Sequence, residues 1–264
     1  GTNMYLTVSA ALKEAQKSRD SNVGAVADAI AIGSLMGARG NSGVIFSQLM
    51  RGFAKRLHGL ALASPSDVGA ALSEAANVAY KAVMKPVEGT ILAEARMGAR
   101  AAVQAARDGR DVQGVLDEAI RQGEITLSKT PDMLPTLKEA GVVDAGGKGL
   151  VVFMQGFAMG LRGETVSAGA WAQAPVGAPQ GPRPVQEEIK FRYCTEFIIR
   201  GDHLKPDAVR SSILSAAEGD SMLVVGNENT IKVHVHTNSP GRVLDTCIAY
   251  GSLHEIDIDN MEDQ

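Results

Sequence analysis

Residues 37–53 read GARGNSGVIFSQLMRGF, a glycine-rich turn followed by an amphipathic helix. Glycines allow backbone amides to approach an anion closely, and the first turn of a helix attracts phosphate. A plain turn between two helices, with Ser42 as the capping residue, explains the same stretch, and its spacing alone favours that simpler interpretation. The stretch matches neither the Walker A sequence nor the G-x-G-x-x-G fingerprint. It therefore predicts a helix pair, with phosphate binding as the second interpretation.

The sequence around this stretch is helical from Met4 to about Arg162. It is rich in Ala, Leu, Met, Lys and Glu, and its apolar residues recur at helical spacing. Prolines and glycines mark the helix ends. The expected helices span about 4–17, 23–36, 42–57, 64–84, 90–107, 112–128, 134–139 and 148–161. This pattern predicts an all-α first domain, a barrel or bundle of eight helices.

The composition changes at residues 168–186, AGAWAQAPVGAPQGPRPVQ, which hold four of the ten prolines. Such a segment sustains neither a helix nor a sheet ladder, so it predicts a semi-rigid linker. Strand patterns at 189–199, 222–225, 230–237 and 253–258 follow it, with helices at 206–217 and 239–250. The order β-α-β-β-α-β predicts an α+β, ferredoxin-like second domain. We expect a multi-domain chain with boundaries at 1–166, 167–187 and 188–264.

Composition excludes several classes of protein. The chain has 264 residues, 26 Lys and Arg against 30 Asp and Glu, and a net charge of −4, so it offers no basic surface for nucleic acid. It has only two cysteines, which favours the reducing cytoplasm over an oxidising compartment. No apolar run reaches the ~20 residues of a membrane-spanning helix. We expect a cytoplasmic protein with neither nucleic-acid partners nor a membrane span.

Glycine-containing helix starts recur along the first domain. Each pairs glycine with a hydroxyl, amide or carboxylate group. They are Gly1-Thr2-Asn3-Met4, Val87-Glu88-Gly89-Thr90 and Val143-Asp144-Ala145-Gly146-Gly147-Lys148-Gly149. In an antiparallel bundle several such starts can lie at the same end and converge on a polyphosphate, which strengthens the phosphate interpretation.

A second group of candidate residues lies in His234-Val235-His236. Residues two apart on a strand point to the same face, so both imidazoles project together. By the same parity Cys194 belongs to the polar face of the first strand, and Cys with two His is a good zinc ligand set. Solvated strand histidines and an unrelated thiol are the alternative, and spacing alone favours it. His254 is a further candidate for a fourth ligand, but its register is not fixed by the sequence.

Taken together these motifs resemble a known family. GTNM, GARGNSGVIFSQLMRGF, VMKPVEGTIL and VVDAGGKGL are similar to the nucleotide-binding domain of fatty acid kinase A, a relative of the dihydroxyacetone kinase L-subunit. IKVHVHTNSPG and IDIDNMEDQ resemble the middle domain of the same family. The resemblance implies an eight-helix barrel that binds ATP and Mg²⁺ at one end, and a zinc site of the Cys and two-His type in the middle domain.

The resemblance also implies roles for individual residues. The nucleotide contacts it implies are Thr2, Asn3, Asn41, Ser42, Gly43, Thr90, Asp144, Ala145, Gly146 and Gly147, and the zinc ligands are Cys194, His234 and His236. The family's metal-binding aspartates precede GTN, whereas this chain starts at Gly1, so no magnesium ligand and no catalytic residue is assigned. The family also continues into a third domain. We therefore expect an internal fragment that does not complete the reaction alone.

The function implied by the resemblance is that of a kinase component in phospholipid metabolism. It would use ATP to phosphorylate a fatty acid carboxylate, held by a separate fatty-acid-binding protein, to an acyl phosphate. A dihydroxyacetone-kinase-like phosphotransferase subunit is the first alternative, and a non-catalytic, zinc-stabilised scaffold that senses nucleotide is the second. The acyl-chain preference and the oligomeric state are left open, and a homodimer is compatible with the sequence.

Overall fold

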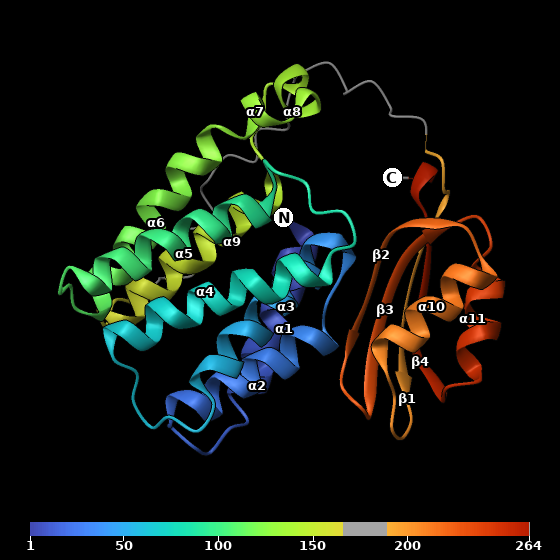
Figure 1. The fold of residues 1–264 in the computed structure, drawn as a ribbon, viewed down its shortest axis with the longest axis horizontal. Helices are drawn as coiled ribbons and strands as arrows, with labels where there is room; N and C mark the ends of the chain where they lie inside the picture. Colours follow the sequence, from blue (N-terminus) through green and yellow to red (C-terminus); the bar gives the residue numbers. More distant parts are fainter. Residues whose placement is uncertain (166–188, 264) are drawn as a thin grey trace. The chain divides into compact units, whose positions relative to one another are not determined.

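The computed structural model describes residues 1–165 and 189–263 (Figure 1). All of the predicted linker, 167–187, lies outside the described residues, so both of its boundaries stay predictions. Contacts between Cα atoms divide the chain into two compact units. Unit 1 comprises Gly1–Leu62, Asn77–Pro86 and Glu187–Gln264, and unit 2 comprises Ala63–Ala76 and Val87–Gln186.

The helices of unit 1 begin with a packed trio. They are α1 (Thr2–Ala15), α2 (Val23–Met36) and α3 (Gly40–Leu57), followed by the end of α4 (Pro65–Ala82). The prediction for α3 needs one correction: the helix begins at Gly40, with Arg39 as its N-cap residue and no capping hydrogen bond from that side chain. Ser42 therefore lies inside the first turn and is not the cap. The Gly43 amide donates to the Arg39 carbonyl, which leaves the amides that precede it in this turn for acceptors outside the helix.

Unit 2 contains the remaining helices of the first half. They are the start of α4, α5 (Ile91–Arg107), α6 (Val112–Ser128), α7 (Thr130–Met133), α8 (Pro135–Ala140) and α9 (Ala145–Leu161). Small and branched side chains pack between α5, α6 and α9 around Ala102, Val115 and Ala119. Among residues 1–165 there are nine helices where eight were predicted, because a one-turn helix, α7, precedes α8. The helical character of this half of the chain is confirmed.

The second half contains four antiparallel strands and two helices. They are β1 (Tyr193–Arg200), α10 (Pro206–Ala216), β2 (Gly219–Gly226), β3 (Thr230–Thr237), α11 (Pro240–Ile248) and β4 (Ser252–Asn260). The strand order is β2-β3-β1-β4, which confirms the ferredoxin-like prediction. The predicted first strand started too early, since the chain before Tyr193 bonds to a side chain: Asn238 accepts from the Arg192 amide and donates to the Lys190 carbonyl.

The two faces of this sheet differ in chemistry. One face carries Phe197, Val224 and Val233 into a core that includes Ile213 of α10 and Cys247 of α11, and Figure 1 shows these two helices beside the sheet. The opposite face carries the even-numbered residues of β1 and β3, including Cys194, His234 and His236. Cys247 is fully buried, as is common for a free cysteine that packs as a small apolar side chain.

Part of the opposite face packs against the start of α3. Leu223 and Val225 of β2 form a small buried cluster with Ala38 and Val44.

Within the described residues, no helix is both long and apolar enough to cross a membrane.

Candidate functional site

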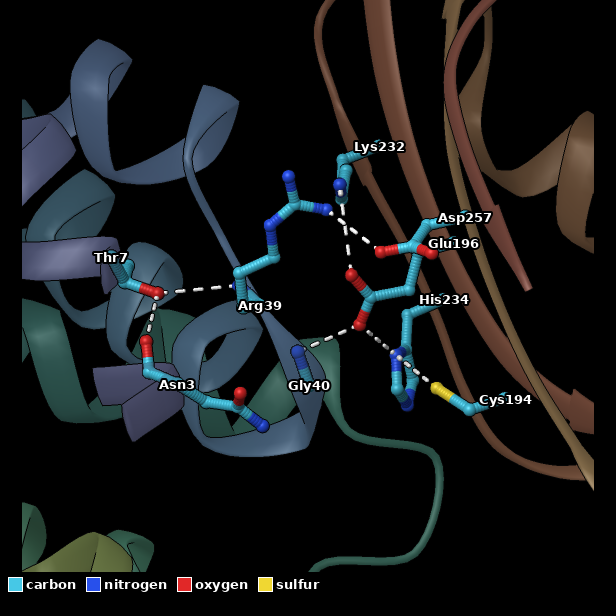
Figure 2. Close-up of polar contacts among 9 residues, drawn as sticks. All are labelled: Asn3, Thr7, Arg39, Gly40, Cys194, Glu196, Lys232, His234 and Asp257. Carbon is cyan, nitrogen blue, oxygen red and sulfur yellow. Dashed lines mark hydrogen bonds and ion pairs between the residues drawn. The ribbon is translucent and has the colours of Figure 1, made fainter. Parts of the chain in front are cut away.

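The start of α3 is held against α1 by a tight polar arrangement (Figure 2). The Thr7 hydroxyl donates to the carbonyl of Asn3 at 2.8 Å and accepts from the amide of Arg39 at 3.2 Å. Gly40 has a φ of +56°, and a Cβ there would lie 2.3 Å from Nδ2 of the Asn3 side chain. At Gly43 a Cβ would lie 2.4 Å from the Thr7 hydroxyl. The structure thus brings Asn3 and Thr7 next to the first turn of α3, and both glycines are needed for this approach.

The remaining predicted nucleotide contacts lie together in unit 2, at the starts of α5 and α9. Asp144 caps α9 by accepting from the Gly147 amide at 2.6 Å, and its own amide donates to the Thr130 hydroxyl at 3.0 Å. Burial raises the pKa of Asp144, while hydrogen bonds from Gly147 and Ile91 act in the opposite direction. Thr90 is the N-cap residue of α5. Asp144 therefore joins the two helix starts, and α9 begins at Ala145, earlier than predicted.

Glu94 is a residue that the sequence analysis missed. It lies on α5, is 1% exposed, and neither carboxylate oxygen has a hydrogen-bond partner within the described residues. A Cβ at Gly147 would lie 2.5 Å from its carboxylate carbon. Burial, with smaller contributions from Asp144 and Glu88, raises the pKa of Glu94 to about 7. Its position three residues after Ile91 and four before Gly98, on the buried stripe of α5, was the available signal.

The Cys and His candidates of the sheet do come together. Strands β1 and β3 are neighbours, with Cys194 opposite His236 and Glu196 opposite His234. One ligand atom from each of Cys194, His234 and His236 lies within 4.8 Å of the others. The imidazole rings of the two histidines are 5.1 Å apart at their centroids and inclined at 63°. His254, the candidate fourth ligand, is not a member of this cluster and bonds instead to the Ser252 hydroxyl at 2.8 Å.

A carboxylate oxygen contacts Nδ1 of each of the two histidines. Nδ1 of His234 lies 2.7 Å from Oε1 of Glu196, and Nδ1 of His236 lies 3.2 Å from Oδ1 of Asp220. His234 is fully buried and its Nε2 has no partner among the described residues. A buried imidazole nitrogen without a partner is costly in free energy unless a ligand satisfies it. This orphaned nitrogen and the soft donor set fit Zn²⁺.

Burial and neighbouring charges set the protonation of this cluster. Burial, reinforced by the negative charges of Glu196, Asp259 and Asp257, raises the pKa of Cys194 to about 12. Burial and the neighbouring His234 lower the pKa of His236. A metal ion would reverse the effect on the thiol, since a coordinating thiol is deprotonated.

Both groups of residues lie in domains that match known family models. The model of the DAK2 domain matches residues 1–159, and the model of the FakA-like middle domain, named for fatty acid kinase, matches residues 190–264. The chain belongs to the DAK2 domain family. The DAK2 domain is followed here by the middle domain in the order that the motifs indicated, so the family resemblance drawn from them is confirmed.

Similarity to curated relatives extends along the whole chain. Protein YloV of Bacillus subtilis is 40% identical over 273 residues, covering 100% of this chain and 49% of its own length. Uncharacterized proteins of Staphylococcus saprophyticus and Staphylococcus aureus strain USA300 are 39% and 38% identical, again over 100% of this chain. The chain thus spans about half the length of the curated relatives it matches. Both matched models describe domains of kinase families.

Proposed function

We propose that this protein is the ATP-binding component of a fatty acid kinase, which transfers a phosphoryl group from ATP to a fatty acid carboxylate and forms an acyl phosphate. The observation that carries the proposal is the pairing of a DAK2 domain with a FakA-like middle domain in one chain. The substrate would arrive on a separate fatty-acid-binding protein.

The start of α3 supports a phosphate-binding role for Asn41, Ser42 and Gly43. Arg39 contributes no side-chain cap. The Gly43 amide donates to the Arg39 carbonyl and the Gly40 amide donates to Glu196, so the amides of Asn41 and Ser42 are the ones left without an acceptor inside the helix. Oriented amides at a helix start favour negative charge, and phosphoryl transfer depends mainly on positioning and charge neutralisation. Thr2, Asn3, Thr90 and the Asp144–Gly147 turn are proposed as further nucleotide contacts on the basis of family resemblance.

Two metal ions enter the proposal in different ways. Mg²⁺ would neutralise the charge of the nucleotide phosphates, and no ligand for it is assigned among residues 1–264. Zn²⁺ would be held by Cys194, His234 and His236, which leaves a coordination position open for another ligand. A thiolate ligand at Cys194 suits the reducing cytoplasm that the cysteine content predicts.

A dihydroxyacetone-kinase-like phosphotransferase remains the alternative function, since the DAK2 domain is common to both interpretations. The fatty acid interpretation is preferred because a simple L-subunit does not need the middle domain. The nucleotide-sensing scaffold is the third interpretation, and it predicts binding of ATP without turnover.

Replacement of Ser42 tests the nucleotide contact. A Ser42→Leu variant should bind Mg-ATP about tenfold or more weakly than the unchanged protein, because the bulky side chain blocks approach to the first-turn amides and removes a hydroxyl. Isothermal calorimetry measures this, and Ser211→Leu, at an exposed position of α10, is the matched control. Unchanged affinity in Ser42→Leu would place the phosphates elsewhere.

A further inference from the structure

Glu196 is a buried carboxylate that the proposed function does not use. It is 4% exposed, and it lies on the same face of β1 as Cys194. A single oxygen, Oε1, makes two short contacts: the backbone amide of Gly40 donates to it at 2.7 Å, and Nδ1 of His234 lies 2.7 Å away (Figure 2). Gly40 is the first residue of α3, so this oxygen touches a helix start and a candidate metal ligand at once.

Nδ1 of His234 lies 2.7 Å from Oε1 of Glu196 and 3.8 Å from Sγ of Cys194, so this ring nitrogen is already engaged within the sheet. An ionised carboxylate only accepts hydrogen bonds, so Nδ1 of His234 carries the proton. The lone pair then resides on Nε2, which is the buried nitrogen without a partner among the described residues. Histidines that bind metals commonly donate their other ring nitrogen to a carboxylate in this way. His236 repeats the arrangement with Asp220.

The contact with Gly40 is part of a wider attachment of α3 to this sheet face. Arg39 forms an ion pair with Asp257 of β4 at 3.2 Å. Unlike Glu196, Asp257 is half exposed. Among the described residues its side chain bonds to Arg39 and makes no hydrogen bond with His234. Glu196 is therefore the group that reaches both the helix start and the histidine.

We propose that Glu196 positions His234 as a metal ligand and, through the same oxygen, links metal binding to the order of the α3 start. When metal binds Nε2, the imidazole is held in one orientation, and the carboxylate that accepts from Nδ1 is held with it. The Gly40 amide then keeps its acceptor for a larger fraction of time. The link to phosphate binding rests on the proposed function, because the proposed phosphate contacts lie at the start of α3. Zinc binding and the order of this helix start can be measured without nucleotide.

A purely structural role for Glu196 is the competing explanation. The side chain of Lys232 is only 1% exposed. Its Nζ lies 3.9 Å from Oε2 of Glu196, which is too far for a hydrogen bond, and it has no hydrogen-bond partner among the described residues. Glu196 would then serve only to balance this buried ammonium. Removing the carboxylate would then lower the stability of the protein, as breaking any buried ion pair does. The loss of stability would be the same in the metal-free and metal-bound forms.

The test measures zinc affinity and hydrogen exchange in the same variants. Zn²⁺ affinity is measured by competition with a chromophoric chelator. Exchange of the amides around Gly40 is followed by mass spectrometry with and without Zn²⁺. Glu196→Gln keeps the shape but loses the charge, Glu196→Ala removes the acceptor, and Asp257→Asn is the control that loosens the same attachment without touching His234. Because Glu196→Ala leaves Lys232 unbalanced, the pair Glu196→Ala with Lys232→Met provides a neutral background.

The expected results separate the two roles. Glu196→Ala and the neutral double variant should bind Zn²⁺ about 10 to 100-fold more weakly, with Glu196→Gln between them and the unchanged protein. The zinc affinity of Asp257→Asn should change far less, because Asp257 acts on Cys194 only through its charge and does not contact His234. Zinc should slow exchange around Gly40 in the unchanged protein and in Asp257→Asn, but not where the acceptor is lost. Normal zinc affinity in folded Glu196 variants would overturn the positioning role. A zinc response around Gly40 that persists without the carboxylate would overturn the link.

Discussion

His236→Ala should abolish high-affinity zinc binding and lower the melting temperature of the sheet domain by about 5 °C or more. The imidazole lies in a cluster whose candidate ligand atoms are all within 4.8 Å, so its loss leaves two ligands where three were available. Metal binding free energy contributes directly to folding, which is why stability should fall together with metal content. Elemental analysis of protein purified without chelator, combined with calorimetry, measures both.

His254→Ala is the matched control for this experiment. His254 lies on β4 in the same sheet, but it bonds to Ser252 and is not a member of the cluster. The variant should retain one zinc ion per chain and an unchanged melting temperature. Zinc retained in His236→Ala, or lost in His254→Ala, would contradict the proposed ligand set.

Glu94→Gln should stabilise the protein at pH 8 and have little effect at pH 5. Burial raises the pKa of Glu94 from 4.5 to about 7, so the folded state holds a proton that the unfolded state has released. Stability therefore falls as the pH rises between these values and is constant above them. The cost of ionising this buried carboxylate is about 3 kcal/mol at pH 8. The neutral amide avoids most of this cost, so we expect a gain of about 1 kcal/mol after the burial of the amide is subtracted.

Urea unfolding at pH 5, 6, 7 and 8 measures this effect. The free energy of unfolding should decline with pH in the unchanged protein and in Glu139→Gln, a substitution at an exposed position of α8. The Glu94→Gln curve should be flatter. Parallel curves for Glu94→Gln and the unchanged protein would show that the carboxylate does not hold its proton at neutral pH.

The fold was largely predictable because local signals and packing agree. Apolar spacing and proline or glycine stops placed most helix ends within a few residues, and period-2 alternation placed β3 where the structure has it. The start of α3 was harder, since a serine in the first turn resembles a cap. Its actual neighbours, Thr7 and Glu196, are far away in sequence. The extra turn of α7 was missed because four residues carry no periodicity.

The metal cluster was only half predictable for the same reason. Parity within a strand put His234 and His236 on one face, but the pairing of β1 with β3 was needed to place Cys194 opposite His236. The same register puts Glu196 opposite His234, a partner that no local pattern indicates. Glu94 was detectable from its place on an apolar stripe. Its lack of partners among the described residues depends on close packing against Gly147, which only the structure provides.

Transfer of the γ-phosphoryl group of labelled ATP to a fatty acid is the most direct test of the proposed function. The assay uses the chain extended at both ends to the length of its relatives, with a fatty-acid-loaded lipid-binding protein, and traps the acyl phosphate with hydroxylamine as the hydroxamate. We expect labelled acyl phosphate that depends on ATP, Mg²⁺ and the loaded partner, and none from residues 1–264 alone. Phosphorylation of dihydroxyacetone instead, or ATP binding without transfer to any loaded partner, would contradict the proposal.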